Sequence, residues 1–232
     1  MRELSVFDII GPNMIGPSSS HTAGALRIAA VARMLAKGQI RGVRFTLYGS
    51  FARTYRGHGT DRALLAGILG FGPEDARLRD AFVWAEASGL RYAFHCDEET
   101  KDLHPNTVDI ALDDDSGRTT VIRGKSIGGG AMVIGKINGV EVDFSGEYNT
   151  LVIEQQDEKG VLAHITKCLC DFNVNIAFAK LFRESKGQIA YTIIETDEAI
   201  PEEAVAKILS AANIWAATLL TLDPRAQNND NL

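Results

Sequence analysis

Residues 150–172 have the sequence TLVIEQQDEKGVLAHITKCLCDF, in which one hydrophobic periodicity gives way to another. The first residues include Thr, Val and Ile, which favour extended structure, and they predict a strand at 150–155. From about 160 to 172 the apolar residues recur every three or four positions, which predicts a helix with one apolar face. The residues of this face are Val161, Leu162, Ile165, Leu169 and Phe172, and Cys168 is expected to pack beside them.

The sequence that follows repeats this order of elements. Strands are predicted at 176–183 and at about 188–195, a helix at 201–211, and a last strand at 214–222. Pro201 suits the first helical position because its missing amide hydrogen is not needed there, and Glu202 and Glu203 favour the helix N-terminus. The resulting order is βαββαβ, the ferredoxin-like split pattern.

The preceding residues, 1–147, predict a separate domain in which helices and strands are mixed without a repeat. Helices are expected at about 20–37, 61–69 and 79–87, and strands at 43–48, 91–95, 107–112, 119–123, 132–137 and 140–144. Asn138-Gly139 between the last two strands is typical of a tight hairpin turn. We therefore predict an α+β protein with domains at 1–147 and 148–223 and a polar tail at 224–232.

Composition excludes several classes of function. The chain has 232 residues, 45% of them hydrophobic, and a formal net charge of -6. An acidic surface does not attract nucleic acid or an anionic membrane, so neither is expected as a partner. No apolar signal core follows Met1 and no apolar run is long enough to cross a bilayer, so we expect a cytoplasmic protein.

The three cysteines are Cys96, Cys168 and Cys170. Their odd number and spacing disfavour a disulfide framework. An iron-sulfur cluster needs several thiolates that converge on one point, whereas Cys168 and Cys170 lie two residues apart in the expected helix and face different directions. We therefore expect no metal site within this chain.

Residues 16–24, GPSSSHTAG, place hydroxyl groups and an imidazole where a helix is expected to begin. The hydroxyls of Ser18, Ser19, Ser20 and Thr22, with the free amides of the first helical turn, are suited to bind a carboxylate or a phosphate. His21 in this cradle can donate a hydrogen bond or transfer a proton. The alternative is a simple serine N-cap, which needs only one such side chain.

Two further histidines occupy turns. His58 lies between Gly57 and Gly59, where nothing local would bury it, and it is the leading candidate for a general base. The alternative is a surface histidine in a flexible turn. His104 precedes Pro105 and is either a second acid or base or part of a turn before a strand.

Four runs of sequence, in this order, resemble one family. They are residues 5–12 leading into 15–25, residues 48–52 with 57–61, residues 104–107, and residues 126–130. They are similar to the beta subunit of iron-sulfur-dependent L-serine dehydratase, which converts L-serine to pyruvate and ammonia. The resemblance implies a 4Fe-4S cluster ligated by a separate alpha subunit, while this chain supplies the acid and base groups and binds the substrate. The implied catalytic residues are His58, His21 and His104, and the implied substrate-binding residues are Ser18, Ser19, Ser20, Thr22 and Asn106.

Residues 157–163 and 173–176 resemble a second family, the ACT domain, which binds amino acids as effectors. The resemblance implies self-association and an effector site formed with a neighbouring subunit, and it places Asp157, Gly160, Val161, Leu162 and Asn175 in or near that site. One alternative is a dimerisation module that binds nothing. Another, for the whole chain, is a noncatalytic amino-acid-binding regulatory protein.

Overall fold

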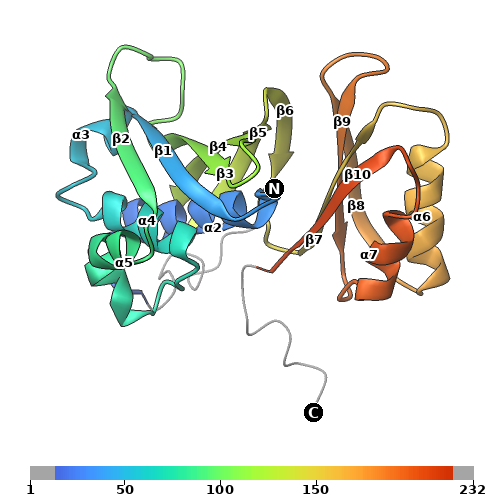
Figure 1. Ribbon diagram of the computed structural model, residues 1–232, viewed down its shortest axis with the longest axis horizontal. Coiled ribbons are helices and arrows are strands. Elements are labelled where there is room, and N and C mark those ends of the chain that lie inside the picture. Colours follow the sequence, from blue (N-terminus) through green and yellow to red (C-terminus); the bar gives the residue numbers. More distant parts are fainter. Residues whose placement is uncertain (1–13, 222–232) are drawn as a thin grey trace. The chain divides into compact units, whose positions relative to one another are not determined.

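The computed structural model describes residues 14–221 (Figure 1). The first run of the resemblance, residues 5–12, and the expected tail at 224–232 lie outside the described residues. The chain consists of two compact units, 1–138 and 139–232, which are divided at the turn formed by Asn138 and Gly139. Both residues have the positive φ that the hairpin requires, 47° and 91°. The boundary expected after residue 147 lies one strand further along the chain.

The first half of the chain mixes helices and strands without a repeat. The π-helix η1 (Ser19–Gly24) leads into α2 (Ala25–Leu35), followed by β1 (Ile40–Tyr48), α3 (Gly49–Thr54), α4 (Thr60–Leu69), the 3₁₀-helix η2 (Ala76–Asp80), α5 (Ala81–Ala87) and β2 (Arg91–Asp97). The strands β3 (Thr107–Asp114), β4 (Thr119–Gly128), β5 (Ala131–Ile137) and β6 (Val140–Phe144) follow. The sheet order is β2-β1-β3-β4-β5-β6, in which only the β1–β2 pair is parallel among the pairs whose register is described.

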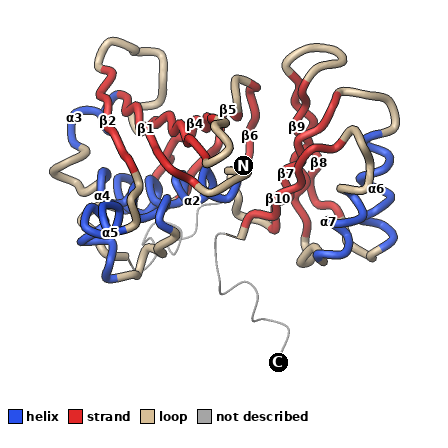
Figure 2. The backbone as a smooth tube through the Cα atoms, in the orientation of Figure 1, coloured by secondary structure: helices blue, strands red, loops and turns tan. Residues whose placement is uncertain are grey.

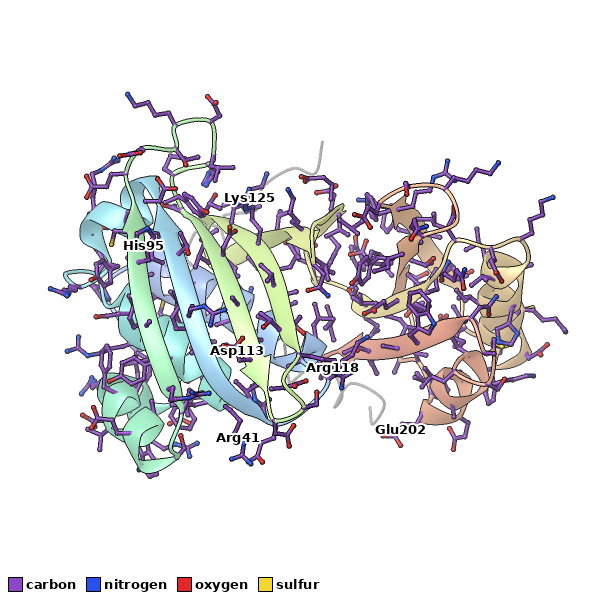
Figure 3. The ribbon with its side chains drawn as sticks, turned by 45° about the horizontal axis from the view of Figure 1, so that its top comes forward. Arg41, His95, Asp113, Arg118, Lys125 and Glu202 are labelled. Carbon is purple, nitrogen blue, oxygen red and sulfur yellow. The ribbon has the colours of Figure 1, made fainter. Side chains whose placement is uncertain are left out.

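Helices α2, α4 and α5 lie on one side of this sheet (Figure 1). The core between them contains completely buried side chains such as Phe45, Leu47, Ile110 and Ile122. Gly67 of α4 packs against the backbone of Leu26 in α2, where any Cβ would collide, so the two helices approach closely. The opposite side of the sheet carries polar side chains, including the labelled His95, Asp113 and Lys125 (Figure 3).

The second half of the chain has the expected βαββαβ order. Its elements are β7 (Asn149–Gln156), α6 (Val161–Asp171), β8 (Ile176–Arg183), β9 (Ile189–Thr196), α7 (Glu202–Ile208) and β10 (Ile214–Leu220). The sheet order is β10-β7-β9-β8, and both helices cover one face (Figure 2). The core includes Leu151, Val161, Ile165, Leu169 and Ile194, and Cys168 is buried beside them as expected. The structure thus confirms an α+β fold with a ferredoxin-like second half.

The structure differs from the expected elements mainly at their ends, and the largest difference in a strand is β4, which runs to Gly128 rather than to residue 123. The first helix opens with a π-turn and ends at Leu35, two residues early, and α3 was not predicted. The helix expected at 79–87 is divided into η2 and α5. Pro201 is the N-cap of α7 with an extended backbone, and it is not the first helical residue.

Candidate active site

His21 lies in the π-turn, and serine hydroxyls hold its ring from one side. Ser18 caps the turn, since its Oγ accepts a hydrogen bond from the His21 amide at 3.3 Å. The Oγ atoms of Ser20 and Ser18 lie 3.0 and 3.4 Å from His21 Nδ1. The wider π-turn carries both hydroxyls to the same ring nitrogen, and such turns occur frequently at functional sites. Ser19 opens the turn and is half-buried.

The other side of the His21 ring contacts α3. Its Nε2 lies 3.1 Å from Ser50 Oγ, and its ring meets the edge of Phe51 at 5.2 Å between centroids. Pro105 O accepts the amides of Ser50 and Phe51 at 2.7 and 3.2 Å, so the loop before β3 fixes this end of α3. Gly49 makes the contact possible, because its φ is +53° and a Cβ would lie 2.8 Å from the Pro105 backbone. Ser50 was not predicted as a site residue, although it lies within one of the four runs.

The structure brings His58 next to His21. The two ring centroids are 4.9 Å apart, and Thr22 Oγ1 donates to the carbonyl of His58 at 3.3 Å. Thr22 is buried, whereas the His58 side chain is exposed. Gly59 follows with a φ of +69° and caps α4. Burial lowers the pKa of His21, and the charge of His58 lowers it further, so His21 is neutral at physiological pH.

His104 and Asn106 lie in the loop that supports this arrangement. The Asn106 amide donates to His104 Nδ1 at 3.2 Å, and Asn106 O accepts from the Ser126 amide at 3.0 Å. Burial, followed by the charge of Lys125, lowers the pKa of His104. Among residues 14–221 no hydrogen bond joins His104 to His21 or His58. Its connection to the histidine pair runs through Pro105 and Ser50.

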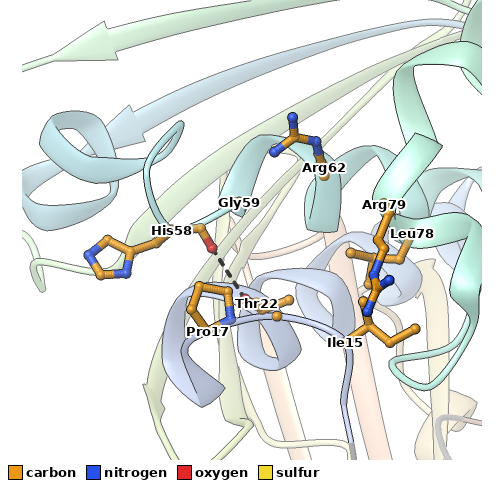
Figure 4. A pocket seen from close by; sticks show the side chains of 9 residues that line it. Ile15, Pro17, Thr22, His58, Gly59, Arg62, Leu78 and Arg79 are labelled. Carbon is orange, nitrogen blue, oxygen red and sulfur yellow. Dashed lines mark hydrogen bonds between the residues drawn. The ribbon is translucent and has the colours of Figure 1, made fainter.

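A cavity of about 460 Å³ opens beside the pair (Figure 4). Thr22, His58 and Gly59 line it on one side. Arg62 and Arg79 extend from neighbouring helices on the other side, and neither was singled out from the sequence. The remaining lining residues are Ile15, Gly16, Pro17 and Leu78. A cavity of this size lies within the range of small-molecule sites.

The candidate effector residues fall into two places. Asp157, Gly160, Val161 and Leu162 lie together at the N-terminal end of α6, where Asp157 Oδ2 accepts from Arg183 Nη1 and from the Gly187 amide, both at 3.0 Å. Asn175 follows the other end of α6 and donates to Asp197 Oδ2 at 2.9 Å. Within one chain the structure therefore does not bring Asn175 to the other four.

Neither a metal site nor a membrane-spanning helix is present among residues 14–221. They contain no group of three His, Cys, Asp or Glu side chains that could hold a metal ion. Cys168 is buried in the core of the second unit and Cys170 on the same helix is exposed, so their thiols do not converge. These residues do not fit an iron-sulfur cluster. Between residues 14 and 221 no helix combines the length and the apolar character that a bilayer crossing needs.

Known proteins resemble this chain along nearly all its length. The family described as serine dehydratase beta chain matches residues 5–88. The "L-serine dehydratase, beta chain" of Peptoniphilus asaccharolyticus is 40% identical over 217 residues, which are 94% of this chain and 98% of that one. The "Probable L-serine dehydratase, beta chain" of Bacillus subtilis (strain 168) is 40% identical over 218 residues, with the same shares of both chains.

A shorter match indicates the same class. The "L-serine dehydratase" of Streptomyces coelicolor is 42% identical over 83 residues, which are 34% of this chain and 18% of that protein. These matches place the chain in the class of serine dehydratases. More particularly, the chain belongs to the family of L-serine dehydratase beta chains.

Proposed function

We propose that this chain is the beta subunit of a two-subunit lyase that converts L-serine to pyruvate and ammonia. The observation that carries the proposal is the pair of imidazoles, His21 and His58, held 4.9 Å apart beside a cavity. Removing water from serine requires a base for the α-hydrogen and help for the departing hydroxyl group. A histidine pair next to a cavity could supply the base for the α-hydrogen. Membership in the beta-chain family does not favour a noncatalytic regulatory protein.

The two histidines are proposed to have different roles. His58 is exposed at the cavity and is the base that takes the α-hydrogen of serine. His21 has a lowered pKa, and it is held between Ser20 Oγ and Ser50 Oγ, so it stays neutral and keeps His58 in position. Because Ser18 and Ser20 are within hydrogen-bonding distance of His21, we assign them to this ring. Thr22 lines the cavity, which supports its proposed role in substrate binding.

Of the remaining candidates, two have supporting roles in this proposal and Ser19 is given none. Ser19, His104 and Asn106 do not line the cavity. Asn106 links Ser126 of β4 to the loop that fixes Ser50, and His104 accepts the Asn106 amide. We therefore infer that His104 and Asn106 position His21 and His58 indirectly, through the loop that holds Ser50.

The cluster is proposed to belong to a separate alpha subunit. The name "beta chain" of the two near full-length relatives supports a partner, and the described thiols of this chain do not converge. When bound in the partner, a 4Fe-4S cluster would supply a Lewis acid for the hydroxyl group of serine. Adding iron and sulfide to this chain alone should give no stoichiometric cluster absorbance, and a cluster formed on this chain alone would contradict the assignment.

The activity is tested by assembling the enzyme. This chain and its alpha chain are purified together without oxygen and given L-serine, and pyruvate is measured. We expect pyruvate only when both chains are present. Equal pyruvate formation by the alpha chain alone would contradict a catalytic role for this chain.

We also propose that the second unit is an ACT domain whose effector lies between two copies. The βαββαβ order and the sheet order β10-β7-β9-β8 support this assignment. An effector's carboxylate would meet the free amides at the start of α6, near Gly160, Val161 and Leu162. Its ammonium group would share the Asp157 carboxylate with Arg183, and Asn175 would come from the second copy.

A further inference from the structure

The described lining of the cavity beside His58 carries positive charge. Arg62 and Arg79 line it, and none of its described lining residues is acidic. Both side chains are exposed, and no ion pair within residues 14–221 involves either guanidinium group. Two carboxyls are adjacent to these arginines in sequence, Asp61 and Asp80, and neither lines the cavity. Asp61 is buried, its Oδ1 accepts the Arg62 amide at 2.8 Å, and the charge of Arg62 favours its ionised form.

Guanidinium groups in this setting select anions. Their planar donors match the two oxygens of a carboxylate or phosphate, and charge-assisted hydrogen bonds are the stronger kind. Because both arginines extend from helices rather than from long loops, their backbone positions are defined by α4 and by the turn η2. The charge of this lining therefore favours a small anion in the cavity.

The charge of the cavity also separates two kinds of carboxylate. L-serine is a zwitterion, and its ammonium group would find two guanidinium groups and no described carboxylate in the lining. L-glycerate is the same molecule with a hydroxyl group in place of the ammonium group, so it carries only the favourable charge. Like charges a few ångströms apart repel, more strongly as water is excluded.

We propose that Arg62 and Arg79 form a carboxylate half-site, which in this chain alone prefers a small anion without an ammonium group. The half-site rests on the proposed function in one respect, because its ligand lies beside the proposed base. In the assembled enzyme the counter-charge for the serine ammonium group then comes from outside the described lining. The two arginines are positioning residues for the carboxylate.

The test is a titration of the full chain, without its partner, at low salt. L-glycerate, L-serine and inorganic phosphate are the three probes, and the readouts are calorimetric Kd and the NMR shift of the His58 ring protons. We expect L-glycerate to bind about tenfold more tightly than L-serine, a difference of about 1.4 kcal/mol. Arg62→Gln and Arg79→Gln should each weaken L-glycerate binding by about tenfold, the loss of one charge-assisted hydrogen bond. Arg41→Gln, at an exposed arginine outside the cavity, is the control and should change nothing.

Each outcome has one meaning. Two outcomes support the proposal. If glycerate and phosphate both bind, depend on the arginines and shift the NMR signals of the His58 ring protons, the cavity is a general anion site. If only glycerate does so, it is a carboxylate site. Equal affinity for L-serine and L-glycerate, or no effect of either arginine in a folded variant, overturns it. Arginine-dependent glycerate binding in a protein that forms no pyruvate with its partner would leave the half-site standing and refute the proposed function.

Discussion

At the scale of single residues, the arrangement around His21 is the most informative. Ser20 and Ser18 approach Nδ1, Ser50 approaches Nε2, and Phe51 packs against the ring. Hydroxyl groups can donate or accept, so they support a neutral imidazole in either tautomer. Both causes of the pKa shift, burial and the neighbouring His58, act in the same direction. His21 is thus built to stay uncharged.

The pKa of His21 gives a test of this environment. In His58→Gln the neighbouring charge is gone, so the pKa of His21 should rise, but burial, the larger cause, remains and keeps the pKa below its ordinary value. NMR titration of the His21 ring protons measures this, with His95→Gln as a control on an exposed strand position. A pKa of His21 that stays the same or falls in His58→Gln would refute the coupling.

The lowered pKa also predicts how stability depends on pH. The unfolded state binds the proton more readily than the folded state, so the contribution of His21 is fully present above about pH 6.5, the unfolded value. It is lost as pH falls through the lower folded-state pKa.

The two histidines could be predicted from the sequence, but three residues near them, Ser50, Arg62 and Arg79, could not. His21 and His58 lie in unusual local sequences, a hydroxyl-rich helix start and a Gly-His-Gly turn, and such signals are visible without a fold. Ser50 and the pair Arg62 and Arg79 have ordinary local sequences, and only the packing of α3, α4 and η2 brings them to the site.

At the scale of elements, the π-helix η1 depends on close packing against β4. Gly24 in η1 lies against Ser126, which is completely buried and whose Oγ has no hydrogen-bond partner among the described residues. A Cβ at residue 24 would overlap the Ser126 hydroxyl. The glycine therefore sets how near η1, with His21, lies to the sheet.

Gly24→Ala should lower the free energy of unfolding by about 1–3 kcal/mol, as is usual for an overpacked core. Gly24→Ala/Ser126→Gly should recover much of this loss, because the overlapping hydroxyl is removed. Gly72→Ala, where a Cβ meets nothing within 4 Å, is the control and should stay within about 0.5 kcal/mol of the original protein. Chemical denaturation measures all three, and an unchanged Gly24→Ala variant would contradict the packing account.

Helix α6 separates the two halves of the proposed effector site. With 11 residues it is ~16 Å long, so Asp157 before it and Asn175 after it do not meet one ligand within a chain. If two copies each supply one half, Asp157→Ala and Asn175→Ala should each abolish L-serine binding to the second unit. An equal mixture of the two variants should regain about a quarter of the sites, since a two-fold mixed dimer has one intact site. Calorimetry with L-serine and D-serine measures this, and no recovery on mixing would contradict a shared site.

The two halves of the chain were predictable from sequence to different degrees. The βαββαβ order was read correctly because each of its helices and strands has a clear periodicity, as in α6 with Val161, Ile165 and Leu169. The first half has the expected strands, but α3 was missed because six residues are too few for a periodic signal. Sheet order was also not available, since strand pairing depends on contacts between distant residues.

At the scale of the whole molecule, segments that are far apart in the sequence contribute to one site. Residues 16–24, 48–52, 57–61 and 104–107 all contribute to holding His21 and His58 through hydrogen bonds or ring contacts. The chain belongs to the family of dehydratase beta chains, and the geometry around His21 and His58 supports our proposal of which groups move a proton. The central claim is that His58 is the base.

The most direct test of that claim is the turnover of the assembled two-chain enzyme with His58→Ala, with pyruvate formed from L-serine as the readout. His95→Ala is the matched control, because His95 is an exposed histidine that takes no part in the His21 arrangement. The account predicts a kcat about 10²–10⁴-fold lower for His58→Ala, the usual loss for a general base, and an unchanged kcat for His95→Ala. A folded and fully assembled His58→Ala enzyme with the original kcat would contradict it.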